Sequence, residues 1–169
     1  MTSPRYQFVV ENDTFLRLIQ VVLDPNAPAE RIEAFAHFCL HDLPDFRGWC
    51  DKIRAQAKNI YPSEVRLVNS QEELLTSLPN ATAGVVEELS FGPPEIAAAG
   101  RNLKFVQKYG FTTRNIDEAA CADNNAKVLT IRRRANISTA EQGLMLMLAL
   151  ARQVTQNANL IGIEQLKAA

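Results

Sequence analysis

The chain has 169 residues, which suits a single domain or a domain with an appendage. Its hydrophobic fraction of 47% and charged fraction of 22% are typical of globular proteins and exclude an intrinsically disordered chain. A formal net charge of −1 gives no reason to expect a nucleic acid or a membrane surface as partner. The sequence shows neither a secretory signal pattern nor an apolar run long enough to cross a bilayer, so we expect a cytoplasmic protein.

The first third of the chain has a mainly helical pattern. Residues 6–10 favour a short strand, but from residue 24 to residue 59 apolar side chains recur at helical spacing. Pro28 suits the first turn of one helix, and Pro44 separates that helix from a second. We therefore expect residues 1–61 to form a helical N-terminal extension, distinct from the domain that follows.

From residue 62 to residue 169 the pattern is that of an α/β domain. Short apolar strands are predicted at 65–68, 83–86, 103–109 and 127–131. Helices are predicted between them at 70–78, 93–100 and 116–122. Strands that alternate with short helices at this spacing indicate a parallel sheet covered by helices.

A long helix is predicted at the end of this domain. The motif Ser138-Thr-Ala-Glu141 is a capping box, which places the first turn of the helix at Ser138 and its end near Thr155. Leucine and methionine fill consecutive positions at 144–148, so the helix is apolar on nearly every side. Such a helix is expected to be buried on several sides, in a homodimer or against another polypeptide.

Two ordered motifs carry a resemblance to a known family. The first lies in LKFVQKYGFTTRNIDEAA, at Leu103, Lys104, Gly110, Asn115, Ile116, Asp117 and Ala120. The second begins at Ala135-Asn136, continues through the Ser138 motif, and ends in an apolar helix closed by Ala-Leu-Ala-Arg at 149–152. In both motifs the chain resembles the D-isomer-specific 2-hydroxyacid dehydrogenases, and a weaker likeness extends upstream to about Glu64.

The resemblance implies a fold for this chain, and it implies that substrate binding and cofactor binding involve two different domains. It implies that residues 62–169 form a flavodoxin-like domain that contributes part of the substrate pocket. The long helix would then lead into a Rossmann domain that binds NAD or NADP and carries the catalytic Arg, Glu and His. Such a helix would pack at a domain junction or dimer interface. The implied substrate is a small 2-keto or 2-hydroxy acid.

The chain itself holds no dinucleotide site that the sequence reveals. A Rossmann phosphate loop needs glycines spaced as GxGxxG, and no two of the seven glycines are one residue apart. The only histidines, His37 and His41, lie in the predicted extension and match no catalytic position. We therefore expect the N-terminal domain of an NAD(P)-dependent dehydrogenase-like oxidoreductase, inactive without a Rossmann domain and with no catalytic residue of its own.

The turn after the strand 103–109 is the first candidate for substrate binding. By resemblance, the backbone amides of Tyr109, Gly110, Phe111 and Thr112 would reach the substrate carboxylate. Gly110 is kept, but Thr112 replaces a family glycine, and Arg114 replaces the usual acidic residue. Alternatively, Gly110 only permits a backbone conformation that other residues disfavour at the end of a strand.

Glu87 and Glu88 are the second candidate. They follow the strand 83–86, where relatives carry an Arg or Ser pair that faces the pocket. Two carboxylates would repel an anionic substrate, so either the substrate differs or these side chains point to solvent. This departure favours an alternative function, a non-catalytic binding or regulatory module that kept the fold.

A metal site is a third and weaker hypothesis. His37 and His41 would lie one helical turn apart and could bind a metal, although an ordinary helix face explains the same spacing. Cys39, Cys50 and Cys121 are odd in number and form no CxxC pair, which indicates reduced and mostly buried thiols.

Overall fold

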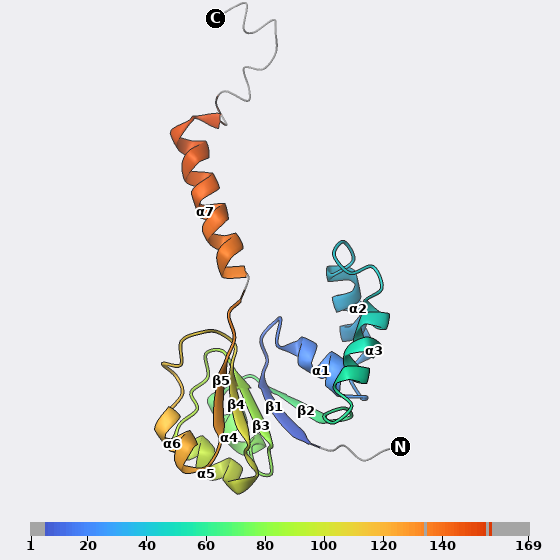
Figure 1. Cartoon of the computed structure of the whole chain (residues 1–169), viewed down its shortest axis with the longest axis vertical. Helices are drawn as coiled ribbons and strands as arrows, with labels where there is room; N and C mark the ends of the chain where they lie inside the picture. The colour runs from blue at the N-terminus through green and yellow to red at the C-terminus, as the bar shows by residue number, and fades with distance from the viewer. Residues whose placement is uncertain (1–5, 134, 155, 157–169) are drawn as a thin grey trace, which may run out of the picture. The chain divides into compact units, whose positions relative to one another are not determined.

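The computed structural model describes residues 6–133, 135–154 and 156. It divides after Ile131 into two units, which we treat separately. The first unit is built on a five-stranded, fully parallel sheet in the order β2-β1-β3-β4-β5 (Figure 1). Its strands are β1 (Gln7–Glu11), β2 (Glu64–Val68), β3 (Ala83–Val86), β4 (Phe105–Lys108) and β5 (Lys127–Thr130).

Helices cover both faces of this sheet, because alternate residues of the strands are apolar on opposite sides. One face packs against α4 (Gln71–Ser77), α5 (Pro93–Ala99) and α6 (Glu118–Asp123), and the short 3-10 helix η1 (Gly100–Asn102) follows α5. The strand side chains in that core are Val9, Val68, Val86 and Val106. The opposite face packs against α1 (Arg17–Leu23), through Phe8, Val10, Val65 and Val85.

Two further helices, α2 (Ala29–Phe38) and α3 (Phe46–Gln56), form a third core against α1. Its centre is aromatic: the ring of Phe46 stacks on Phe35 at a centroid distance of 6.3 Å and on Trp49 at 5.9 Å. Helices α1, α2 and α3 all lie in the long connection between β1 and β2.

We predicted that residues 1–61 form a helical extension separate from the domain that follows, and the structure differs. Strand β1 lies inside the sheet, where Val9 pairs with Arg66 of β2 and with Gly84 of β3. Residues 1–61 thus supply a central strand of the same fold, and residue 62 marks no boundary between domains. The helical pattern of residues 24–59 obscured this, because it reflects an insertion between two strands that pair with one another.

The other sequence predictions for the first unit agree with the structure. The strands β2 to β5 and the helices α4 to α6 lie where they were predicted, with ends that differ by a few residues. The order 2-1-3-4-5 with flanking helices is that of flavodoxin-like domains, which confirms the expected fold class. Helix α1 was not predicted.

The second unit contains α7 (Ala135–Ala151). It begins three residues before the predicted cap, so Ser138 lies inside the helix and the expected start there is wrong. No proline stops the helical backbone from continuing upstream through Ala-Asn-Ile, and a capping box is only a preference. The predicted end near Thr155 falls at a residue outside the described ones. Within the described ranges, no helix combines the length and hydropathy needed to span a bilayer.

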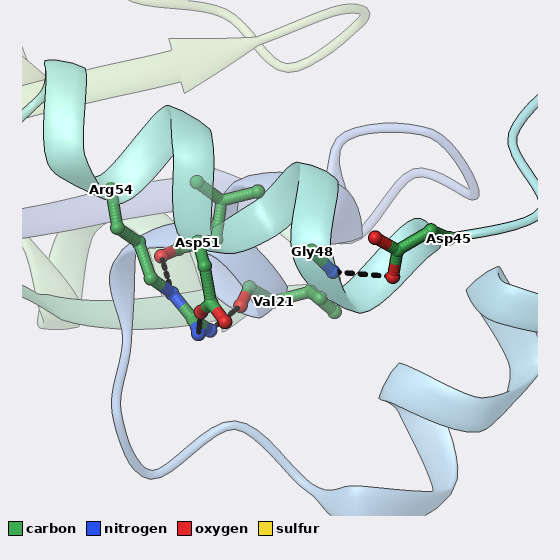
Figure 2. Close-up of polar contacts among 6 residues, drawn as sticks. Val21, Asp45, Gly48, Asp51 and Arg54 are labelled. Atoms are coloured by element: carbon green, nitrogen blue, oxygen red, sulfur yellow. Dashed lines mark hydrogen bonds and ion pairs between the residues drawn. The ribbon is translucent and has the colours of Figure 1, made fainter.

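Arg54 ties α3 to α1 (Figure 2). Its Nε donates to the carbonyl of Val22 at 3.0 Å, its Nη2 donates to that of Val21 at 2.9 Å, and its Nη1 pairs with Asp51 at 3.0 Å. The two carbonyls belong to the last turn of α1, where no intrahelical donor is available. A guanidinium at this end of a helix also complements the helix dipole. Arg54 therefore fixes the inserted helices on the layer that covers the sheet.

Replacing Arg54 with alanine should lower the free energy of unfolding by about 1–3 kcal/mol, because two helix-end carbonyls lose a charged donor. Denaturant unfolding followed by circular dichroism measures this. Arg66→Ala is the matched control, since Arg66 is exposed and forms an ion pair with Glu64, whose side chain is also largely exposed, and surface pairs contribute about 0–1 kcal/mol. An Arg54→Ala loss no greater than that of Arg66→Ala would contradict the assigned role.

Candidate functional site

The carboxyl edge of the sheet is where a ligand is expected in this topology. In open parallel sheets, ligands bind outside the carboxyl ends of the strands, at the point where the strand order reverses. Here the chain leaves β1 toward β2 on one side, while β3 lies on the other side of β1. The reversal therefore lies between Glu11, the last residue of β1, and the residues that follow Val86 of β3.

The chain fills this point with one of its own carboxylates. Glu11 Oε2 accepts hydrogen bonds from the backbone amides of Glu87 at 2.7 Å, Glu88 at 2.9 Å and Leu89 at 3.0 Å. Successive amides that converge in this way form a site suited to an anion. Because Glu11 occupies it, the amides of residues 87–89 are already satisfied.

Two carbonyls of the same segment accept hydrogen bonds from side chains elsewhere in the chain. Asn115 Nδ2 donates to the carbonyls of Leu89 at 2.6 Å and Glu87 at 3.2 Å. The ammonium group of Lys108, a side chain only 8% exposed at the end of β4, also donates to the Glu87 carbonyl. Residues 87–89 are thus held by donors and acceptors from three separate parts of the chain, and their backbone conformation is strongly constrained.

A close backbone approach positions the next part of this segment. A Cβ added at Gly84 would lie 2.5 Å from the ring of Phe91, which is fully buried, so only glycine fits in β3 at this point. The amide of Phe91 donates to the Asn115 carbonyl at 2.8 Å, and its carbonyl accepts from Asp117 at 2.9 Å. The segments after β3 and β4 are therefore joined along the edge.

The predicted residues Glu87 and Glu88 lie at this reversal point. Glu87 is half-buried and Glu88 is exposed. Their backbone amides bind Glu11, and this leaves those amides no role toward a substrate. Whether either carboxylate contacts a ligand stays a prediction.

The other predicted residues, Tyr109, Gly110, Phe111 and Thr112, form the turn after β4. Val86 pairs with Lys108, and the Tyr109 amide donates to the Val86 carbonyl at 2.8 Å, so this turn and Glu87 lie side by side. The sheet therefore brings the two predicted groups together. Gly110 has a positive φ of 158°, a conformation that other residues rarely adopt, so the expectation that glycine permits the backbone here is confirmed, although an added Cβ would make only an ordinary contact with Lys108. Contact between this turn and a substrate stays a prediction.

An open cavity of about 600 Å³ adjoins these segments without including the predicted residues. Its lining residues are Gln71, Ser90, Phe91, Gly92, Pro94, Glu95, Arg114, Asn115, Ile116 and Asp117. Arg114 is exposed and brings a guanidinium to it, the group best suited to bind a carboxylate with two parallel hydrogen bonds. Arg114 was noted in the sequence only as a departure from the family pattern.

Glu11 and Lys108 were missed by sequence reasoning, although each had a signal. Glu11 directly follows the apolar strand predicted at 6–10, and Lys108 is a charged residue near the end of the strand predicted at 103–109. A charged residue at the carboxyl end of a parallel strand is a candidate for the ligand edge.

The histidines do not have the geometry that the metal hypothesis needs. Helix α2 ends at Phe38, so exposed His41 lies in the following turns and not one helical turn beyond His37. The described residues contain no group of three or more His, Cys, Asp and Glu side chains placed to hold a metal ion. Cys50 and Cys121 are buried free thiols, and burial raises the pKa of both.

Two proteins of known function are similar in sequence. The chain is 35% identical over 106 residues to the D-3-phosphoglycerate dehydrogenase of Archaeoglobus fulgidus and 31% identical over 86 residues to the hydroxypyruvate reductase of Thermotoga maritima. These matches cover 63% and 51% of the chain but 20% and 28% of the relatives. The chain thus spans less than a third of either relative. No protein-family model matches it.

Solved structures show the same fold. The pyruvate reductase of Chlamydomonas reinhardtii superposes with a TM-score of 0.51 at 12% identity, and the D-lactate dehydrogenase of Escherichia coli with a TM-score of 0.52 at 10% identity. Each comparison covers 92% of this chain and 38% or 40% of the other. At these identities the likeness concerns the fold.

Removing the Glu11 carboxylate should loosen the carboxyl edge. Glu11→Ala should cost about 1–3 kcal/mol, because charge-assisted hydrogen bonds to three amides are lost. Hydrogen exchange measured by NMR should show faster exchange at the amides of residues 87–89. Glu11→Gln keeps one acceptor oxygen and should give a smaller effect.

Glu88→Ala is the matched control, since it removes a neighbouring exposed carboxylate with no bond to these amides. Exchange at residues 87–89 that is the same in Glu11→Ala and Glu88→Ala would show that Glu11 does not hold the segment.

Proposed function

Because this chain is a homologue of the D-2-hydroxyacid dehydrogenases, we propose that it is the N-terminal, substrate-side domain of an oxidoreductase that acts on small 2-keto or 2-hydroxy acids. The observation that carries the proposal is the 35% identity over 106 residues with a D-3-phosphoglycerate dehydrogenase. The flavodoxin-like sheet is consistent with such a domain.

The cofactor of such an enzyme, NAD or NADP, does not fit the residues of this chain. Its glycines are nowhere spaced to let backbone amides approach a pyrophosphate. The converging amides at the switch point, residues 87–89, hold the Glu11 carboxylate. Our proposal therefore assigns the nucleotide to a Rossmann domain, on the same or another polypeptide, and holds that this chain alone is inactive.

The residues that we assign to substrate lie after β4. The turn at Tyr109–Thr112 is anchored by a hydrogen bond from the Ile131 amide to the Gly110 carbonyl at 3.0 Å. Arg114, a few residues on, can bind the substrate carboxylate as a cation. In this proposal the chain binds and orients the acid, and the acid–base groups come from the other domain.

A binding or regulatory module without catalysis is the second candidate. It is favoured by the Glu11 carboxylate, which fills the amide cluster at the switch point with an internal anion. Glu87 and Glu88 add further negative charge beside it. An anionic substrate placed there would be repelled by these groups.

The two candidates differ in activity. The chain alone, given NADH or NADPH and a panel of pyruvate, glyoxylate and hydroxypyruvate, should leave the nicotinamide unoxidised. A fusion to the nucleotide-binding domain of the Thermotoga maritima hydroxypyruvate reductase should reduce at least one acid, measured by the loss of absorbance at the nicotinamide band. A correctly folded fusion that binds NADH and reduces none of them would favour the module.

Substrate binding is tested on the chain itself. Titration with the acid that the fusion reduces should shift the amide NMR signals of residues 109–115, and Arg114→Gln should weaken binding roughly tenfold through the loss of one charged contact. Arg101→Gln is the control, because Arg101 is also exposed but lies in η1, before β4. Equal effects of the two variants would remove Arg114 from the site.

We also propose that α7 binds a second copy of this chain or the nucleotide domain. Exposed apolar side chains lie along it at Leu144, Met145, Leu146, Met147, Leu148 and Leu150. Successive residues of a helix are rotated by about 100°, so a run from 144 to 148 covers every side. Such a surface is suited to burial against another polypeptide.

The association is checked by sedimentation. The chain should form dimers whose fraction rises with micromolar concentration, and the double variant Met147→Glu, Leu148→Glu should be monomeric. Gln142→Glu is the control, because it adds one charge at a polar position of the same helix. A clean monomer of the unmodified chain at micromolar concentration would count against self-association.

A further inference from the structure

A second cavity lies between α2 and the segment that links β1 to α1. Its volume is about 410 Å³, within the range of small-molecule sites in proteins. Its lining residues are Thr14, Phe15, Arg17, Glu30, Arg31, Ala34, Phe35 and Phe38. None of them belongs to the candidate site, and five of the eight lie in the inserted helix α2.

Three aromatic rings line this cavity. Phe15 and Phe38 meet edge to face, with ring centroids 6.1 Å apart and planes at 65°. They are 51% and 69% exposed, and Phe35 lies half-buried beside them. Exposed aromatic side chains gathered around one hollow are characteristic of a surface that is covered by a ligand.

Two guanidinium groups reach the same cavity. Arg17 Nε donates to Asn12 Oδ1 at 2.7 Å, and Arg31 Nη1 donates to Gln20 Oε1. Both acceptors are neutral amide oxygens, and among the described residues neither arginine forms an ion pair with a carboxylate. The amides hold the arginine side chains in place without neutralising their charge, so each guanidinium keeps donors for an anion.

We propose that this cavity binds a small organic acid with an aromatic or branched apolar body. The body packs against Phe15, Phe35 and Phe38, and the carboxylate is held by Arg17 and Arg31. A ligand of this kind complements both the apolar wall and the two guanidinium groups.

Glu30 distinguishes two classes of ligand that carry such a carboxylate, a plain acid and an amino acid. It lines the cavity from the first turn of α2 and is exposed. A plain aryl-alkyl acid leaves Glu30 without a role, whereas an amino acid would place its ammonium group near this carboxylate. The two ligands share the same contacts with the rings and the arginines.

Calorimetric titration with 3-phenylpropionate tests the site, with 3-phenyl-1-propanol as the uncharged comparison. The acid should bind saturably and at least roughly tenfold more tightly than the alcohol, because a charged contact of about 1.4 kcal/mol separates them. Amide NMR shifts should fall on residues 14–17 and 30–38. Arg17→Gln and Arg31→Gln should each reduce the affinity for the acid toward that for the alcohol.

Two further variants complete the test. Phe38→Ala should weaken acid and alcohol alike, since it removes part of the shared apolar wall. Arg66→Gln, in an exposed arginine outside the cavity, should change neither. Circular dichroism and denaturant unfolding of each variant show that the fold is retained.

Equal affinities for acid and alcohol, no loss in either arginine variant, or shifts confined to other residues would each overturn the proposal. Phenylalanine identifies the source of the carboxylate. If Glu30→Gln weakens phenylalanine but not 3-phenylpropionate, the ligand class is an amino acid; if it strengthens both, the class is a plain acid. The readout is binding, so failure of the dehydrogenase proposal leaves this test unaffected.

Discussion

The carboxyl edge of the sheet depends on one contact. In it, the Glu11 carboxylate at the end of β1 binds the backbone segment that follows β3. Strand β1 ends at Glu11, and the side chain reaches three successive amides after β3, at 2.7 to 3.0 Å. Those amides would otherwise be unpaired at the crevice where this topology places ligands. One internal anion therefore fixes the backbone after β3 and also occupies the place that a bound anion would take. In our proposal, a ligand of the edge therefore relies on the turn after β4 and on Arg114.

Arginines that could bind an anion lie away from Glu11, in two cavities of the first unit. Glu11, Glu87 and Glu88 gather at the centre of the edge, with the ammonium group of Lys108 against the same segment. Arginines line both cavities, Arg114 in the one next to α5 and Arg17 and Arg31 in the one next to α2. An anion avoiding the centre would find a guanidinium in either cavity, but only the second also offers an aromatic wall. The two proposals therefore assign different acids to the two cavities: a small polar acid after β4, and an acid with an apolar body beside α2.

Local sequence patterns predicted the strands β2 to β5 and the helices between them, because each element there is short, apolar and bounded by turn or capping residues. The role of β1 was not predictable in the same way. Five residues favour a strand, but only the pairing of Val9 with both Arg66 and Gly84 makes that strand central, and pairing over such distances leaves no local pattern. Glu11 was missed for the same reason. Its side chain binds amides 76 residues and more away along the chain, whereas Glu87 and the turn after β4 were assigned by resemblance.

The inserted helices α2 and α3 form a layer outside the one that covers the sheet. A connection between two adjacent parallel strands needs only one covering helix, and α1 meets that need through Leu16, Ile19 and Leu23. The helices α2 and α3 pack on α1 and are held by Arg54 at the end of α1, so they add a layer that the sheet does not require. That layer supplies much of the aromatic cavity, since three of its five α2 residues, Ala34, Phe35 and Phe38, are apolar and line it together with the segment after Glu11. The ligand proposed for this cavity would give the insertion a role that the sheet itself does not require.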